Sequence, residues 1–198
     1  MVPGDCRPAQ RASRDRIAAL REHLAAIGAE ALLVPSADPH LSEYLPDRWQ
    51  GRRWLSGFTG SQATLIVAAH KAALFADSRY WEQAGAELAG SGVDLVKIPN
   101  AGSTLHLEWL ARELPKGAVV AVDGQVLGLG AASALRAALD TAGIALRTDV
   151  DLLDAVWTGR SGLPTEAVYE HEPPHATQTR VQKLAAVREA MTKHRATH

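Results

Sequence analysis

The first folded segment of the chain carries apolar side chains at helical spacing. They recur every three or four residues, at Ile17, Leu20, Leu24 and Ile27. This is the pattern of a helix with one apolar face. Ser13 precedes it as a candidate N-cap, and Gly28 follows the last apolar position as a helix stop. The sequence therefore predicts an amphipathic helix from Ser13 to Ile27.

Short, continuous apolar runs then alternate with further helical patterns. The runs that predict strands cover residues 31–34, 63–68, 72–76, 93–98, 119–122 and 144–146. Helices are predicted after Asp77 or Ser78, from Ser103 to Leu114, and from Ala131 to Ala142. Only the turn at His70 and Lys71 is short enough for a hairpin. This order predicts an α/β fold, with a mixed, mostly parallel β-sheet flanked by helices.

The composition divides the chain into four parts. Residues 1–13 have two prolines and no apolar repeat, so we expect a disordered leader. Residues 14–158 form the predicted α/β domain, and residues 159–178, rich in Gly, Pro and Thr, form a predicted linker. Residues 179–198 are expected to be one helix whose apolar face has no partner element, which indicates the first helix of a truncated second domain.

Charge and cysteine content exclude several classes of protein. The net charge of -1 and pI near 6.7 give no overall attraction for nucleic acid or for an anionic membrane. Cys6 is the only cysteine, so an intrachain disulfide is impossible and a reducing compartment fits. The first residues lack the apolar run of a signal peptide, and no apolar run reaches about 18 residues. We therefore expect a cytoplasmic protein.

Several separated motifs occur together in this chain. Residues 36–61 contain S-A-D-P-H-L-S-E-Y-L-P and then R-R-W-L-S-G-F-T-G-S. F-A-D-S-R-Y follows at 75–80, V-A-V-D at 120–123, and D-L-L-D-A-V-W-T-G-R-S-G-L-P at 151–164. In these blocks and their order, the chain resembles the N-terminal domain of the three-domain Xaa-Pro aminopeptidases, the aminopeptidase P group of the creatinase/aminopeptidase P superfamily.

This resemblance implies a hydrolase that removes the N-terminal residue preceding a proline. In the family, two divalent cations, often manganese, perform the hydrolysis in a C-terminal domain. The resemblance thus implies no catalytic residue, metal ligand or cofactor in this chain, which would shape the substrate entrance and take part in a homodimer. The alternative is a catalytically inactive superfamily member that acts as a protein-interaction module.

Two other patterns imitate functional motifs. Asp140 and Asp151 have the spacing of the family's first two metal ligands, but the first lies in an Ala-rich helical pattern and the second at a helix start. We interpret them as a solvated carboxylate and a helix cap. Gly128, Gly130 and Ser133 resemble part of a dinucleotide fingerprint whose third glycine is absent. We interpret that segment as a loop and a helix start.

The loop after the first predicted strand holds the first candidate site residues. His40, Glu43 and Tyr44 follow a buried strand, at the position where α/β sheets place ligand sites. The functional hypothesis is a role in the substrate entrance or a subunit contact. The structural alternative is that Asp38 caps a short helix whose first turn contains Pro39.

The second candidate group combines two cations with an aromatic ring. Arg52, Arg53 and Trp54 are suited to binding a carboxylate or stacking on a partner surface. The alternative for these arginines is an internal ion pair with Glu43 or Asp47. Nearby, Gly57 and Gly60 are expected to mark tight turns. Asp77, Arg79 and Tyr80 are expected to form a cap, an ion pair and aromatic packing.

Overall fold

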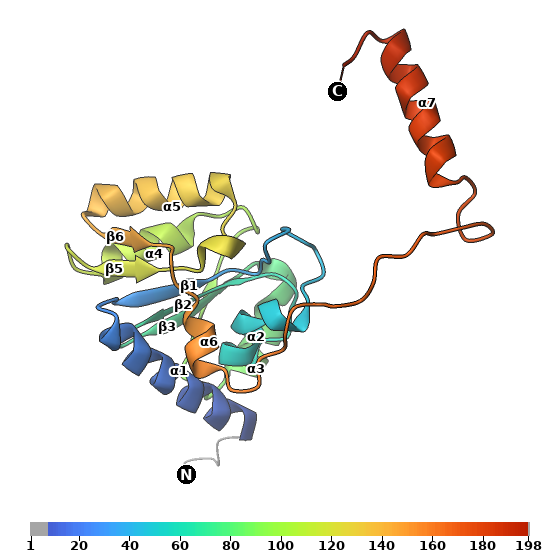
Figure 1. Cartoon of the computed structure of the whole chain (residues 1–198). Coiled ribbons are helices and arrows are strands. Elements are labelled where there is room, and N and C mark those ends of the chain that lie inside the picture. The colour runs from blue at the N-terminus through green and yellow to red at the C-terminus, as the bar shows by residue number, and fades with distance from the viewer. Residues whose placement is uncertain (1–7, 198) are drawn as a thin grey trace. The chain divides into compact units, whose positions relative to one another are not determined.

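The computed structural model describes residues 8–197 of the chain. Six strands form one sheet in the order β4-β3-β2-β1-β5-β6 (Figure 1). The strands are β1 (Ala31–Val34), β2 (Thr64–Ala68), β3 (Ala72–Ala76), β4 (Asp94–Lys97), β5 (Val119–Ala121) and β6 (Ala145–Arg147). β2 pairs antiparallel with β1 and β3, whereas the β1–β5, β3–β4 and β5–β6 pairs are parallel. The predicted mixed, mostly parallel sheet is confirmed.

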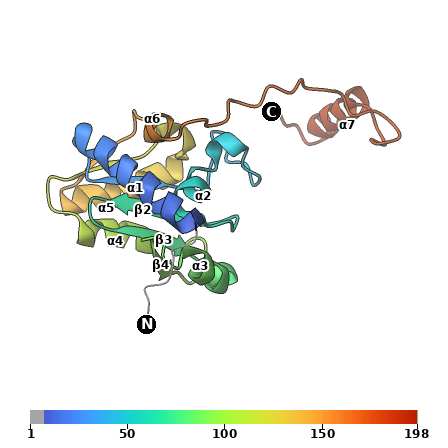
Figure 2. The ribbon, with the colours of Figure 1, turned by 90° about the horizontal axis from the view of Figure 1, so that it is seen from below.

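Helices cover both faces of the sheet, as Figure 2 shows in a view from below. One apolar core contains residues of α1 (Pro8–Ala26), α2 (Gly51–Ser56), α3 (Trp81–Leu88) and α6 (Leu152–Val156). The other contains residues of α4 (Leu105–Glu113) and α5 (Leu129–Ala142). Alternate strand residues enter opposite cores; Leu65 and Val67 of β2 lie in the first and Ile66 in the second. Burial on both faces explains why the strands read as continuous apolar runs.

The first helix extends further toward the N-terminus than predicted. α1 begins at Pro8 within the described residues, so residues 8–13 are helical and the expected leader was wrong for them. Residues 1–7 of that leader lie outside the described residues. Ser13 is not an N-cap: it is buried in the helix, and its hydroxyl donates a hydrogen bond to the Ala9 carbonyl. A serine that bonds four residues back is compatible with a helix interior.

Several predicted element ends are confirmed by the backbone and its bonds. Gly143 ends α5 in the left-handed region, and its N–H bonds back to Asp140 and Leu139. Asp77 caps the short helix η2 (Ser78–Tyr80) and pairs with Arg79 at 2.8 Å. Asp151 caps α6 by accepting a hydrogen bond from the Leu153 N–H.

The chain divides into two compact units, one ending at Leu163 and one beginning at Pro164. The predicted linker began at residue 159, but the side chain of Arg160 is only 4% exposed and packs in the first unit. Gly- and Pro-rich composition therefore marked the start of the linker too early. In the second unit, Thr179 caps α7 (Arg180–Lys193) with a capping box. No helix among residues 8–197 is long and apolar enough to cross a bilayer.

Candidate functional site

The carboxyl ends of β1 and β5 form a crevice at the edge of the sheet. These two strands are parallel neighbours, with Leu32 paired to Ala121. The chain leaving β1 turns to the 3-10 helix η1 (Asp47–Trp49) and to α2, beside the first core. The chain leaving β5 passes through η3 (Gly124–Val126) to α5, beside the second core. Such a divergence between adjacent parallel strands is where α/β sheets bind ligands.

The loop after β1 is organised by one buried carboxylate. Asp38 is 2% exposed, and its Oδ1 accepts hydrogen bonds from the backbone N–H groups of His40 and Ser42, both at 2.9 Å. Burial alone would raise the pKa of Asp38, but these bonds outweigh it and lower the pKa. The short helix proposed after Asp38 does not form, because the carboxylate closes a turn in which Leu41 has a positive φ of 54°.

This turn presents the predicted loop residues to solvent. His40, Glu43 and Tyr44 are all exposed, and the Tyr44 side chain is 86% exposed. Two apolar side chains are exposed beside them, Leu41 at 63% and Leu129 at the start of α5 at 89%. The loops after β1 and β5 meet here, since a Cβ on Gly128 would lie 3.2 Å from Leu41. We call Leu41, Tyr44 and Leu129 the apolar rim.

Arg52 is not available to a substrate or partner. The residue is 3% exposed and donates hydrogen bonds to Ser36 Oγ at 2.8 Å and to the carbonyls of Phe58 at 3.2 Å and Gly60 at 2.5 Å. Burial lowers its pKa to about 10, so it stays charged at neutral pH. Both predicted roles, a surface contact and an ion pair with Glu43 or Asp47, were wrong, because Arg52 instead ties together the turn that follows α2.

Arg53 and Trp54 occupy different surroundings from Arg52. Arg53 is exposed and lines a surface depression with Asp47 and Gln50. Trp54 is half-buried, and its ring stacks on Trp157 with a centroid distance of 5.0 Å and an interplanar angle of 13°. Of the two arginines in this motif, only Arg53 therefore presents its charge to solvent.

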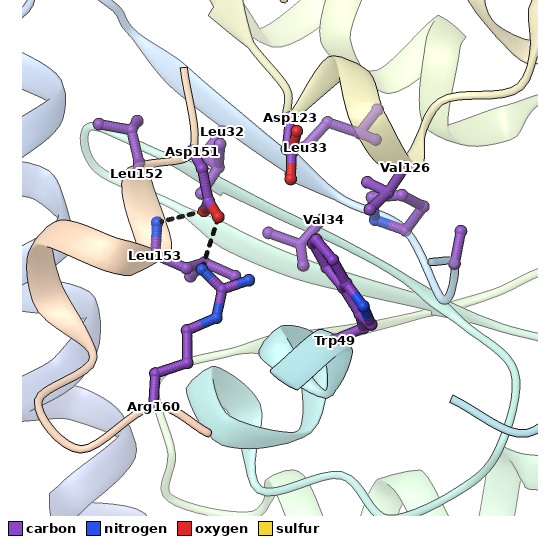
Figure 3. A pocket seen from close by; sticks show the side chains of 12 residues that line it. Leu32, Leu33, Val34, Trp49, Asp123, Val126, Asp151, Leu152, Leu153 and Arg160 are labelled. Atoms are coloured by element: carbon purple, nitrogen blue, oxygen red, sulfur yellow. Dashed lines mark hydrogen bonds and ion pairs between the residues drawn. The ribbon is translucent and has the colours of Figure 1, made fainter. Parts of the chain in front are cut away.

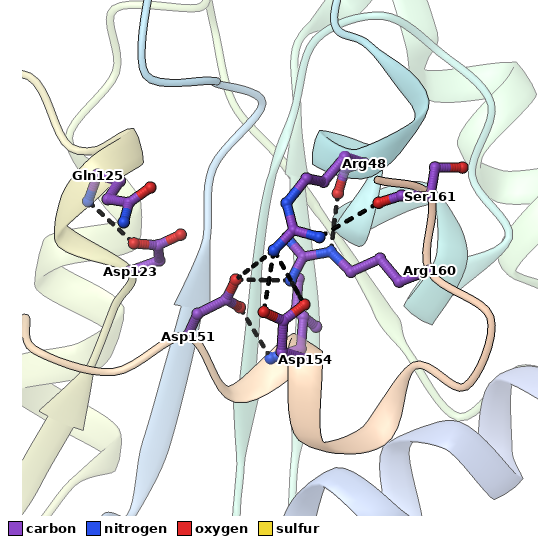
Figure 4. A network of polar contacts seen from close by, with 8 residues as sticks. Arg48, Asp123, Gln125, Asp151, Asp154, Arg160 and Ser161 are labelled. Atoms are coloured by element: carbon purple, nitrogen blue, oxygen red, sulfur yellow. Dashed lines mark hydrogen bonds and ion pairs between the residues drawn. The ribbon is translucent and has the colours of Figure 1, made fainter. Parts of the chain in front are cut away.

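A charged network at α6 was missed by sequence reasoning (Figure 4). Arg160 Nη1 lies 2.6 Å from Asp151 and 2.8 Å from Asp154, and Arg48 Nη2 lies 2.9 Å from Asp154. Burial would raise the pKa of Asp154, but the hydrogen bond from Arg48 and the charge of Arg160 together lower it. Arg48 is more than one hundred positions from Asp154 and Ser161, so no local pattern predicts the contact.

A small cavity lies in the crevice between β1, Trp49 and this network (Figure 3). Its volume is about 30 Å³, which is room for a water molecule and not for a peptide. Asp123 lines it with Asp151 and Arg160. Burial, together with the negative charges of Asp151 and Asp154, raises the pKa of Asp123. Asp123 ends the V-A-V-D segment, directly after a predicted strand. Because α/β sheets bind ligands at the carboxyl ends of their strands, the sequence could have predicted Asp123 in this crevice.

The residues that imitate other sites have structural surroundings. Among residues 8–197, no group of three or more His, Cys, Asp and Glu is arranged to hold a metal ion. Asp140 is exposed on α5, whereas Asp151 caps α6 and pairs with Arg160. Gly128 is the residue before α5 and Gly130 lies inside that helix, with η3 between them and β5. This is not the strand–turn–helix arrangement that binds a dinucleotide pyrophosphate.

Known proteins resemble this chain over most of its length. It is 33% identical to Xaa-Pro aminopeptidase 2 of Sus scrofa over 90% of this chain and 26% of that protein. It is 35% identical to a probable Xaa-Pro aminopeptidase P of Talaromyces stipitatus over 92% of this chain and 28% of that protein. The chain thus spans about a quarter of the length of these relatives.

A solved structure shares the fold. The X-prolyl aminopeptidase of Caenorhabditis elegans, described as a cytosolic enzyme with a di-nuclear active site, superposes with a TM-score of 0.77. It is 32% identical in sequence, and the match covers 92% of this chain and 31% of that one. The family model of the creatinase/prolidase N-terminal domain matches residues 16–160. The chain therefore belongs to the creatinase/prolidase N-terminal domain family.

Proposed function

We propose that this chain is the non-catalytic N-terminal part of a metal-dependent Xaa-Pro aminopeptidase, a hydrolase that removes the residue before a proline. The observation that carries the proposal is the match of nearly the whole chain to Xaa-Pro aminopeptidases of pig, fungal and nematode origin. The hydrolytic centre would lie in the part of the longer protein that corresponds to the remainder of those relatives.

The metal chemistry is assigned to that other part of the protein. Two divalent cations, with manganese as the expected ion, would supply the hydroxide and stabilise the oxyanion there. The di-nuclear active site described for the nematode enzyme supports two ions.

This part would shape the substrate entrance and contribute to a homodimer. The apolar rim supports the role, because it exposes Leu41 and Tyr44 on the loop after β1 and Leu129 at the start of α5. His40 and Glu43 are exposed on the same loop, and Arg53 is exposed on α2. Aromatic and arginine side chains are the types enriched where proteins contact peptides and each other. A cytoplasmic location follows the nematode enzyme, which is described as cytosolic.

The test is peptide hydrolysis by the protein encoded by the complete gene. With manganese added, we expect release of the first residue from peptides with proline in second position, and no release when alanine replaces that proline. The resemblance to the family implies two Asp, one His and two Glu as the metal ligands in the longer sequence. Absence of hydrolysis, together with loss of these ligands, would contradict the enzyme and support an interaction module.

A further inference from the structure

Three tryptophans and three arginines form a connected cluster around the point where the chain leaves the first unit, and one of its contacts places Arg48 over the Trp49 ring at 5.4 Å. Arg16 of α1 lies over the Trp54 ring at 4.8 Å, and Trp54 stacks on Trp157. The guanidinium of Arg160 lies 5.7 Å from the Trp157 ring centre and 5.4 Å from that of Trp49. Each contact is a cation–π or stacking interaction, worth most where water is excluded.

Ion pairs and backbone bonds fix the same segment from the other side. Arg48 Nη2 contacts both carboxylate oxygens of Asp154, at 2.9 and 3.1 Å, in charge-assisted hydrogen bonds. Arg48 also donates to the Ser161 carbonyl at 3.2 Å, and Arg160 Nε donates to the Arg48 carbonyl at 2.9 Å. The side chains of Arg160 and Arg48 are only 4% and 19% exposed.

Beyond this cluster the chain is held much less. Residues 161–175 are all exposed, and the second unit begins at Pro164. The short segment from Trp157 to Ser161 is thus fixed by side-chain contacts with η1 and α2, which are more than one hundred positions away in the sequence. A segment held by a few side chains opens separately from a sheet core.

We propose that Arg48, Asp151, Asp154 and Arg160, with Trp49 and Trp157, form an exit latch that sets where the fixed domain ends and the mobile connection to the next unit begins. Closed, it places the first free residue near Gly162. Open, it also releases Thr158 to Ser161, which lengthens the connection by roughly 14 Å at about 3.4 Å per extended residue. The latch thereby controls the range over which the following unit can move, and it does not rest on the proposed peptidase function.

Hydrogen exchange of the chain itself tests the latch. The backbone N–H groups of Trp157 and Arg160 bond to Leu153 and Trp157 carbonyls, so they report on closure. In Arg48→Ala we expect their exchange to accelerate at least tenfold, while β2 and β3 amides exchange as in the parent. Asp154→Asn, a milder change on a half-exposed carboxylate, should give a smaller acceleration at the same amides.

Two controls separate a latch from general destabilisation. Arg112→Ala removes an exposed arginine that pairs with Glu113 on α4, far from the cluster in sequence, and it should change neither set of amides. Trypsin should cut the parent after Arg180, whose side chain is 73% exposed, and cut after Arg160 only in the latch variants. Unchanged exchange at Trp157 and Arg160 in both variants, or equal acceleration in β2 and β3, would overturn the proposal.

Discussion

The guanidinium of Arg52 lies 5.0 Å from the centre of the Phe58 ring and donates a hydrogen bond to the carbonyl of the same residue. One buried cation thus contacts both the side chain and the backbone of Phe58, which is itself fully buried. Because Arg52 also bonds Ser36, it connects the chain after β1 to the turn after α2. Arg52, which the sequence analysis proposed for binding a carboxylate or a partner surface, instead stabilises the interior of the domain.

Replacing Arg52 should lower the free energy of unfolding much more than replacing its neighbour Arg53. Arg52→Ala would leave the Phe58 and Gly60 carbonyls without their buried donor, while Ser36 Oγ would keep its hydrogen bond from the Ala63 N–H, so we expect a loss of about 2–4 kcal/mol in unfolding free energy. Arg53→Ala, at the next position but exposed, should stay within about 0.5 kcal/mol. Urea denaturation measures both. Equal losses for the two variants would contradict the assignment of Arg52 to the interior.

Alanine substitutions at two glycines should change the stability of the domain in opposite directions. A Cβ at Gly60 would lie 2.3 Å from Phe58 Cζ and 2.7 Å from Tyr80, so Gly60→Ala should destabilise the domain by about 1–3 kcal/mol. Gly85 lies exposed inside α3 with nothing within 4 Å, so Gly85→Ala should stabilise by about 0.5–1 kcal/mol. Thermal unfolding distinguishes them, and a stabilising Gly60→Ala would show that the turn is loose.

Asp123→Asn should stabilise the domain at neutral pH. Burial raises the pKa of Asp123, so the folded state holds its proton more tightly than the unfolded state, and stability falls as pH rises through that interval. Asparagine removes the half-buried charge and keeps an oxygen for the Gln125 N–H. The thermal midpoint of the variant should exceed that of the parent at pH 7, and the difference should vanish below about pH 3.8.

Asp77→Asn should show the opposite pH dependence. The hydrogen bond from Arg79 lowers the pKa of Asp77, so its contribution is present at neutral pH and lost as pH falls through the lowered folded value. The variant should unfold at a lower temperature than the parent at pH 7, with the gap closing in acid. If the difference in unfolding temperature between parent and variant stayed constant from pH 7 to pH 3, the lost charge of Asp77 would not be the cause of that difference.

Tyr44→Ala should separate entrance function from folding. Because the side chain is 86% exposed, unfolding free energy should change by less than about 0.5 kcal/mol. In the protein encoded by the complete gene, we expect kcat/KM for X-Pro peptides to fall at least threefold. His70→Ala is the matched control, exposed on the β2–β3 turn at the other edge of the sheet. Equal effects of both variants would count against a role for the rim.

Local patterns predicted the strands, most helix ends and the sheet class, because period and end signals depend on neighbouring residues. The helix α2 was not predicted, and the orientation of Arg52 was missed with it: Leu55 and Ser56, three and four positions later, are buried on the same helix face. Reading Arg52 and Arg53 as a pair overlooked that adjacent helical residues point in different directions.

The exit latch lay beyond such reasoning. Arg48 contacts Asp154 and Ser161, which are more than one hundred positions away in the sequence, so the contact is a product of tertiary packing. Composition pointed the other way, since Gly159 and Gly162 beside Pro164 are typical of a linker. The prediction that Ser13 is an N-cap was wrong for a related reason. A residue that often caps helices is also tolerated in a helix interior when its hydroxyl donates a hydrogen bond to the preceding turn.

The most direct test of the division of labour is to incubate this chain alone with manganese and a peptide that has proline in second position, following the free N-terminal residue by mass spectrometry. We predict no release above a sample without protein, and no tight manganese binding by calorimetry. Release of the first residue, dependent on manganese and on the proline, would contradict the assignment of the hydrolytic centre to another part of the protein.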